Sequence, residues 1–181
     1  MIIDAIPDRT DPSHGTVIWQ QGGGREVRVP CRLGKRGVIA AADKREGDGC
    51  TPAGTWRLRR VHLRTDRIPS ITTAAVVRAT QPTDGWCDDV NDANYNTLVS
   101  LPFPASHETL HRDDGLYDVV VELGYNDDPP VAGNGSAIFM HVMSDDGKAT
   151  EGCVALAKDD LLRLLKDTDT DTRIRIHLPA T

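Results

Sequence analysis

The sequence predicts a mainly β domain with one or two short helices. Apolar residues occur in short runs rich in Val, Ile and aromatic side chains, and Gly, Pro, Asp and Asn bound these runs, as is typical of strands joined by turns. Helical spacing is clear in one segment, residues 156–166, where Leu161, Leu164 and Leu165 recur. A chain of 181 residues has the usual size of one domain, so we expect a single domain over residues 1–181.

The N-terminal part is expected to form short strands separated by tight turns. Residues 1–26 are polar and turn-rich, which predicts an edge strand near 16–20 before a run of three glycines. Apolar segments follow at 27–33 and 37–41. The sequence between them, Gly-Lys-Arg-Gly at 34–37, indicates that these two strands form a hairpin.

Two further strands and a long irregular segment come next. Residues 54–64 alternate in a way that predicts a strand with long basic side chains on one face, and 74–79 predict another. Residues 80–104 are rich in Asp, Asn, Gly and Pro, with Trp86 and Tyr95 as expected anchors. Loops of this length in a compact domain are usually functional or disordered. The aromatic anchors favour an ordered insertion beside a functional cleft.

The C-terminal part carries the clearest elements. Residues 116–125 are the strongest predicted strand, because β-branched side chains lie between turn signals. A short strand is expected at 138–142, then a polar loop, then the helix at 156–166. The helix has acidic residues near its start, where its dipole favours negative charge. A final strand is expected at 172–178.

His141 and Cys153 lie on opposite sides of one polar loop. We expect Cys153 to begin the turn into the helix, with Gly152 allowing close backbone approach. A cysteine ahead of a helix N-terminus and near an imidazole can have a lowered thiol pKa, and the thiolate is the nucleophile. The plain alternative is a small buried cysteine and a structural histidine. These residues alone leave both interpretations open.

The residues around this pair extend the pattern. Thr-Glu-Gly-Cys-Val at 150–154, with His141 twelve positions before the cysteine, resembles the YkuD-type L,D-transpeptidase domain. Thr-Pro-Ala-Gly-Thr-Trp at 51–56 is similar to a second segment of that family. The resemblance covers about residues 27–178 and implies a β-sandwich or barrel with a helix after the cysteine. Three short segments look like one branch of the family: residues 44–49, 85–87 and 94–96.

The resemblance implies thiol acyl transfer on peptidoglycan stem peptides or muropeptides. His141, oriented by the backbone carbonyl of Val142, takes the proton of Cys153, and the sulfur attacks the carbonyl of an L-centred residue joined to D-Ala. Backbone N–H groups of Gly152 and Cys153 would hold the oxyanion. Water as acceptor makes an L,D-carboxypeptidase, which we expect. An amine acceptor makes an L,D-transpeptidase, the alternative.

The chain departs from the family pattern at two positions. Glu151 stands where a histidine is usual, and its carboxylate would disfavour a thiolate. Ala155 stands where Arg or Asn is often found. On the substrate side we expect Glu151, as a contact to a substrate ammonium, together with Trp86, Tyr125 and Asn126. These departures keep open another class, an inactive module that binds peptidoglycan fragments.

His107-Glu108-Thr109-Leu110-His111 matches the H-E-x-x-H pattern of zinc peptidases. In those enzymes the two histidines lie one helical turn apart. Here prolines lie just upstream and Asp-Asp-Gly just downstream, so any helix would have about two turns and no apolar face. We therefore expect a short turn beside the cleft, no metal and no cofactor.

Composition excludes some partners and compartments. A net charge of −6 and a pI near 5.4 leave no basic stripe for nucleic acid. No signal peptide or membrane-spanning stretch is recognisable, which predicts a cytoplasmic monomer, or a periplasmic one if a leader has been trimmed. No Cys-x-x-Cys pair is present, so Cys31, Cys50 and Cys87 are expected to be structural thiols, with a bridge among them left open.

Overall fold

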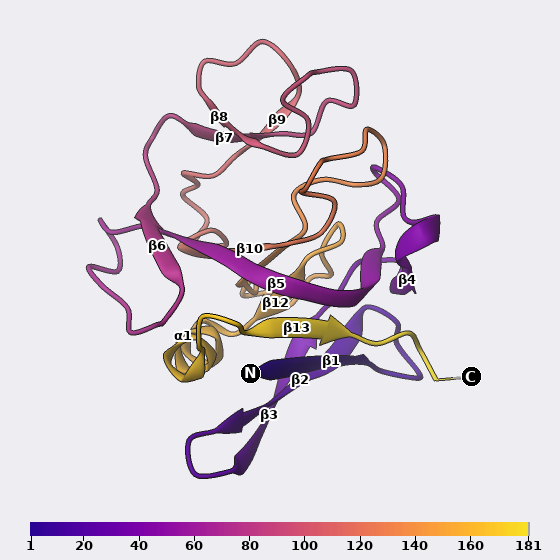
Figure 1. The fold of residues 1–181 in the computed structure, drawn as a ribbon, viewed down its shortest axis with the longest axis vertical. Helices are drawn as coiled ribbons and strands as arrows, with labels where there is room; N and C mark the ends of the chain where they lie inside the picture. Colours follow the sequence, from indigo (N-terminus) through magenta and orange to yellow (C-terminus); the bar gives the residue numbers. More distant parts are fainter. Residues whose placement is uncertain (181) are drawn as a thin grey trace.

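Most of the regular structure in residues 1–180, the part that the computed structural model describes, is β-strand (Figure 1). The helices are η1 (Ala41–Asp43), a single 3₁₀ turn, and α1 (Lys158–Asp167). The strands, in chain order, are β1 (Ile2–Pro7), β2 (His14–Gln21), β3 (Arg25–Arg32), β4 (Val38–Ala40), β5 (Thr51–Leu63), β6 (Val76–Ala79), β7 (Asp84–Cys87), β8 (Leu98–Ser100), β9 (His107–Thr109), β10 (Val119–Leu123), β11 (Phe139–Val142), β12 (Val154–Leu156) and β13 (Arg173–Ile176).

The large sheet closes on itself. Its strands follow the order β10-β11-β12-β3-β2-β1-β13-β5-β4, and β5 also pairs with β10. The path therefore returns to its starting strand and forms a barrel, which leaves no free edge along the ring. The long β5 makes this closure possible, because it pairs with β13 through residues 54–57 and with β10 through residues 58–63. The predicted mainly β fold of sandwich or barrel type is confirmed.

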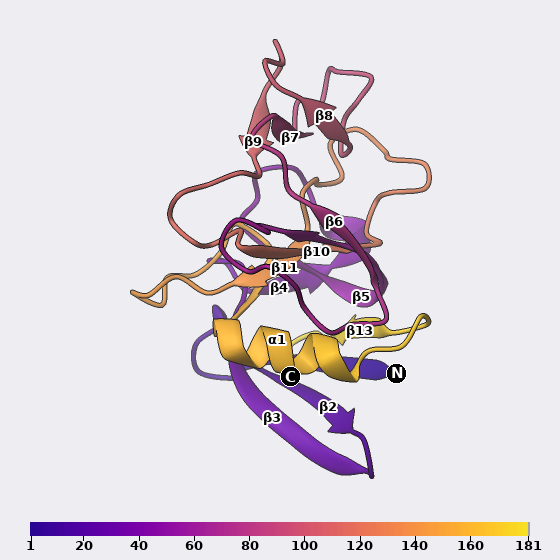
Figure 2. The same ribbon diagram turned by 90° about the vertical axis from the view of Figure 1, so that its left-hand side faces the viewer.

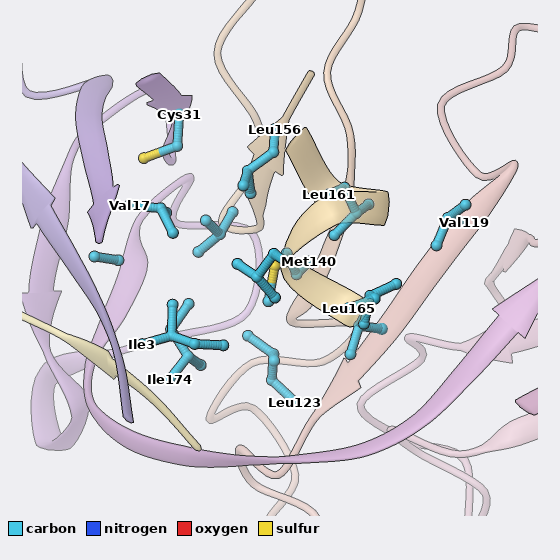
Figure 3. Packing of buried hydrophobic residues seen from close by; sticks show 14 of the residues in the cluster. Ile3, Val17, Cys31, Val119, Leu123, Met140, Leu156, Leu161, Leu165 and Ile174 are labelled. Carbon is cyan, nitrogen blue, oxygen red and sulfur yellow. The ribbon is translucent and has the colours of Figure 1, made fainter. Parts of the chain in front are cut away.

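The barrel interior holds the main hydrophobic core (Figure 3). Alternating residues of the N-terminal strands point inward, so that Ile3 and Val17 are fully buried. The amphipathic helix α1 covers the core with Leu161, Leu164 and Leu165, all fully buried. Each buried leucine stabilises the fold by roughly 1.5–3 kcal/mol. Figure 2 shows α1 lying across the barrel near the N-terminus.

The helix α1 is ten residues long. Across residues 1–180, the structure contains no helix with both the length and the apolar character needed to cross a membrane. All four cysteines lie in this range as free, buried thiols, so the bridge left open for Cys31, Cys50 and Cys87 is not formed in this structure.

A smaller sheet, β8-β7-β9, stands apart from the barrel in Figure 1. β7 and β8 come from residues 80–104, the segment that was expected to be an ordered insertion, and β9 follows just after it. The segment is ordered, but it contains strands as well as loops. Both expected anchors are buried, with Trp86 8% and Tyr95 4% exposed. The Trp86 ring meets Phe139 of β11 edge-on at a centroid distance of 5.0 Å, which fixes the small sheet to the barrel.

Two expectations for the N-terminal part are wrong. The predicted hairpin between β3 and β4 has the right turn, because the Gly37 N–H donates to the Gly34 carbonyl at 2.7 Å. The two strands do not pair, however: β3 pairs with β2 and β12, and β4 runs parallel to β5. β2 is also not an edge strand, because it lies between β3 and β1. The polar composition of residues 1–26 concealed β1, which buries only alternate residues, among them Ile3 and Ala5.

Candidate active site

The register of β11 and β12 brings His141 and Cys153 onto one face of the barrel wall. These parallel strands pair Met140 with Val154 and His141 with Ala155. Side chains alternate along a strand, so Met140 and Val154 enter the main core while His141 points the other way. Cys153, two residues before Ala155, shares the face of His141. Both side chains line the same cavity, of about 790 Å³.

The segment after Cys153 corrects the prediction of a helix N-terminus at the sulfur. Residues Val154–Leu156 form β12, and α1 begins only at Lys158. The apolar run after the cysteine continues the pattern of the later leucines, which is why it was assigned to the helix. β12 is buried on both faces between β11 and β3. No helix dipole therefore acts directly on the thiol.

The sulfur of Cys153 lies among backbone groups at the floor of the cavity. Its S–H donates to the Ala137 carbonyl at 3.2 Å, and the Phe139 N–H donates to the sulfur at 3.4 Å. The residue is 8% exposed. Burial, and secondly the negative charge of Glu108, raise the pKa of Cys153 to about 12. The side chain of Cys153 is therefore a protonated thiol at neutral pH, not the thiolate that a helix N-terminus would favour.

His141 is held as a neutral base. Its Nδ1 lies 2.8 Å from the Val142 carbonyl, which can only accept, so Nδ1 carries the proton and Nε2 is free to accept one. The Tyr117 ring packs against the imidazole edge-on at 5.3 Å. Burial lowers the pKa of His141 to about 4, against a smaller opposing effect of the Val142 carbonyl. The contact with Val142 is the one that the family resemblance implied.

Gly152 has a backbone conformation and an environment that exclude other residues. Its φ is +146°, and an added Cβ would lie 2.8 Å from the Cys50 carbonyl oxygen. The Gly152 N–H, expected to bind an oxyanion, donates to Thr150 Oγ1 at 3.1 Å. Thr150 Oγ1 in turn donates to the Cys153 carbonyl at 2.8 Å. This predicted oxyanion donor is thus already engaged in the resting conformation.

Two threonines, which the sequence analysis did not select as site residues, hold the backbone around Gly152 and Cys153 in place. Thr51 Oγ1 accepts the Gly34 N–H at 2.8 Å and lies 3.5 Å from the carbonyl oxygen of Cys153, the same atom that Thr150 binds. Thr51 and Thr150 open the two motif segments, 51–56 and 150–154. Their position at the start of both segments was the available signal.

Asn96 is a further residue that the sequence interpretation missed. Its Oδ1 accepts from Trp86 Nε1 at 2.9 Å and from the Ala137 N–H at 3.0 Å. Its Nδ2 donates to the carbonyls of Tyr125 at 3.3 Å and Asn126 at 2.7 Å. Ala137 has a φ of +52°, which is rare for a residue with a side chain, and its carbonyl faces the sulfur. The Asn96 amide therefore holds the backbone that positions the thiol.

Three of the four expected substrate residues lie outside the cavity lining. Trp86 is buried against Phe139, Tyr125 donates its hydroxyl to the Asn134 carbonyl at 2.6 Å, and the Asn126 amide binds loop carbonyls. Their contacts are those of structural residues. Glu151 does line the cavity, at its mouth, where its carboxylate lies 2.8 Å from Lys35 Nζ.

The H-E-x-x-H segment lies beside the cavity, as expected, but as a strand instead of a turn. β9 carries His107 and Glu108, and both residues line the cavity. His107 Nδ1 donates to the Ala105 carbonyl at 2.8 Å. The helical pairing of histidines that zinc peptidases use is not formed here. In the range 1–180 no group of three His, Cys, Asp or Glu side chains could hold a metal ion.

The comparison with family models agrees with the sequence resemblance. The family model of the L,D-transpeptidase catalytic domain, YkuD, matches residues 9–176. Among solved structures, L,D-transpeptidase 1 of Mycobacterium tuberculosis aligns with 97% of this chain at 12% identity and a TM-score of 0.39. The chain spans 61% of that protein's chain. No curated protein matches significantly.

Proposed function

The chain belongs to the YkuD family of L,D-transpeptidase catalytic domains, and on this premise we propose that it is a cysteine-dependent acyl transferase acting on peptidoglycan stem peptides. The observation that carries the proposal is the common placement of Cys153 and His141 on one face of β11 and β12, at one cavity. A volume of about 790 Å³ is within the range of sites that bind small molecules and short peptides.

The proposed first step transfers the acyl group to sulfur. Cys153 attacks the carbonyl of the L-centred residue that precedes D-Ala, and His141 Nε2 takes the thiol proton as the S–C bond forms. The protonated imidazole then gives this proton to the departing D-Ala amine as the C–N bond breaks. Because thiol and imidazole are both neutral at rest, the proton moves together with the attack instead of before it.

Backbone N–H groups of residues 152 and 153 would stabilise the oxyanion of this step. The Gly152 N–H must exchange Thr150 Oγ1 for the substrate oxygen. This exchange of hydrogen-bond partners needs little rearrangement of the loop, because the hydroxyl of Thr150 keeps its bond to the Cys153 carbonyl. Loss of one such donor typically lowers the rate by about 10²-fold or more.

We propose water as the acceptor of the acyl group, which makes the protein an L,D-carboxypeptidase. Support comes from the depth of the sulfur: Cys153 is 8% exposed, so a thioester formed there is more accessible to a small nucleophile than to a second peptide. Water would give its proton to His141, attack the thioester carbonyl, and release the tripeptide acid and the regenerated thiol.

An amine acceptor is the second candidate, and a neighbouring depression favours it. This depression, of about 420 Å³, shares Asp114 and Ser144 with the main cavity. Asp118 and Asp145 also line it, so its surface is acidic. Asp118 is already paired with Lys158 at 2.9 Å and Asp114 with Arg112, but the carboxylate of Asp145 would attract an incoming ammonium group.

One experiment separates these functions. The protein is incubated with a disaccharide tetrapeptide, with and without D-Met, and the products are identified by mass spectrometry. Tripeptide alone indicates hydrolysis, while D-Met exchange or a cross-linked dimer indicates transfer to an amine. Cys153→Ala should abolish every product. If neither protein forms a product and both bind the tetrapeptide equally in calorimetry, the protein is an inactive module that binds peptidoglycan fragments and not an enzyme.

A further inference from the structure

Glu108 places a carboxyl group inside the cavity. It lies on β9, lines the same cavity as Cys153 and His141, and is half-buried. Within residues 1–180, the hydroxyl of Tyr117 supplies its one hydrogen bond, at 2.5 Å, and no Lys or Arg forms an ion pair with it. Its second oxygen is therefore available to a ligand.

The basic side chains around the cavity form ion pairs with other carboxylates. Arg112 binds Asp114 through Nε at 3.0 Å, while its guanidinium lies 5.1 Å from the centroid of the Tyr117 ring. Lys148 Nζ lies 2.6 Å from Asp146. Neither basic side chain forms an ion pair with Glu108. Burial raises the pKa of the Glu108 carboxyl, and the nearby charge of Arg112 opposes this only in part.

The other acidic side chain expected to meet substrate is less suited to that role. Glu151 is 73% exposed at the mouth and already paired with Lys35 at 2.8 Å. An ammonium binding there would displace an existing cation and would be screened by solvent. At Glu108 it would meet a half-buried, unpaired charge, where attraction is stronger.

We propose that Glu108 determines substrate specificity by binding the free side-chain ammonium of the diamino acid whose carbonyl Cys153 attacks. This proposal rests on the proposed function and narrows the substrate class to stem peptides with an unmodified amine. It also gives the ammonium a second effect. The charge of Glu108 is one cause of the raised pKa of Cys153, so a cation beside it makes loss of the thiol proton easier. The correct substrate thus promotes its own attack.

The test compares an L-Lys tetrapeptide with its Nε-acetylated form. The wild-type protein should turn over the free amine with a kcat/KM about tenfold or more higher, a modest value for a partly buried ion pair. Glu108→Gln retains the shape of the side chain and an acceptor for Tyr117. It should abolish the preference, so that the two peptides have about equal kcat/KM. Asp171→Asn makes the same charge change at an exposed position and should keep the wild-type preference.

Binding to the Cys153→Ala protein separates this proposal from the proposed function. Calorimetry should show tighter binding of the free amine, and adding Glu108→Gln should remove the difference. Tighter binding of the free amine without turnover would support the Glu108 site and would contradict the proposed acyl-transfer reaction. Turnover with equal kcat/KM for both peptides would keep the reaction and overturn the Glu108 proposal. Loss of the preference in Glu151→Gln instead of Glu108→Gln would also overturn it.

Discussion

The buried imidazole of His141 should make stability fall on acidification by an amount that can be calculated. Its folded-state pKa of about 4 lies below the ordinary value of 6.5. A depressed pKa gives stability that is present above pH 6.5 and lost as pH falls toward 4, because the unfolded chain binds the proton first. Between pH 7 and 4 the loss from this residue is about 3 kcal/mol.

The assay is urea unfolding of the wild-type protein and of His141→Gln at several pH values between 7 and 4. All other titrating groups are shared, so the difference between the two stability curves isolates His141. The wild-type protein should lose about 3 kcal/mol more than the variant over this interval. Parallel curves would show that the imidazole titrates normally. They would refute the burial of His141 as a neutral group.

Three further outcomes follow from the site. Gly152→Ala should destabilise the protein by about 2–4 kcal/mol in urea unfolding, because it combines a strained φ with a contact to the Cys50 carbonyl; unchanged stability would contradict this. Asn96→Leu should cost about 3 kcal/mol in urea unfolding by stranding two buried N–H donors, and unchanged stability would contradict the role of this amide. Cys153 in the free protein should react with iodoacetamide about 10³-fold more slowly at pH 7 than an ordinary thiol, and labelling as fast as free cysteine would disprove the raised pKa.

Local patterns were sufficient for the elements that alternate clearly. The strands β5, β10 and β13 were predicted within a few residues, because their apolar periodicity matches the side of the sheet that each residue faces. The helix α1 was placed two residues too early, since the buried run of β12 leads directly into its leucines. Strand pairing could not be predicted, because the partner of β4 is selected by β5 and not by the adjacent turn.

The residues of the site also differ in how far the sequence alone could predict them. His141 and Cys153 flank one loop, so the sequence could predict that they lie at the same cavity. Asn96, between β7 and β8, and Glu108, on β9, reach the site through contacts that span more than ten residues of sequence. Both lie in segments that the sequence analysis singled out, but neither local pattern indicated these contacts. Trp86 was correctly predicted as an anchor, but its buried position gives it no surface in the cavity.

The most direct measurement of the central claim is the intact mass of the protein after rapid acid quenching of a reaction with tetrapeptide. The wild-type protein should carry an added tripeptide acyl group, released by hydroxylamine and located at Cys153 by peptide mapping. His141→Gln should accumulate it far more slowly, and Cys153→Ala should carry none. Release of tripeptide by the wild-type protein with no adduct at any quench time, and equal release by Cys153→Ala, would contradict the account.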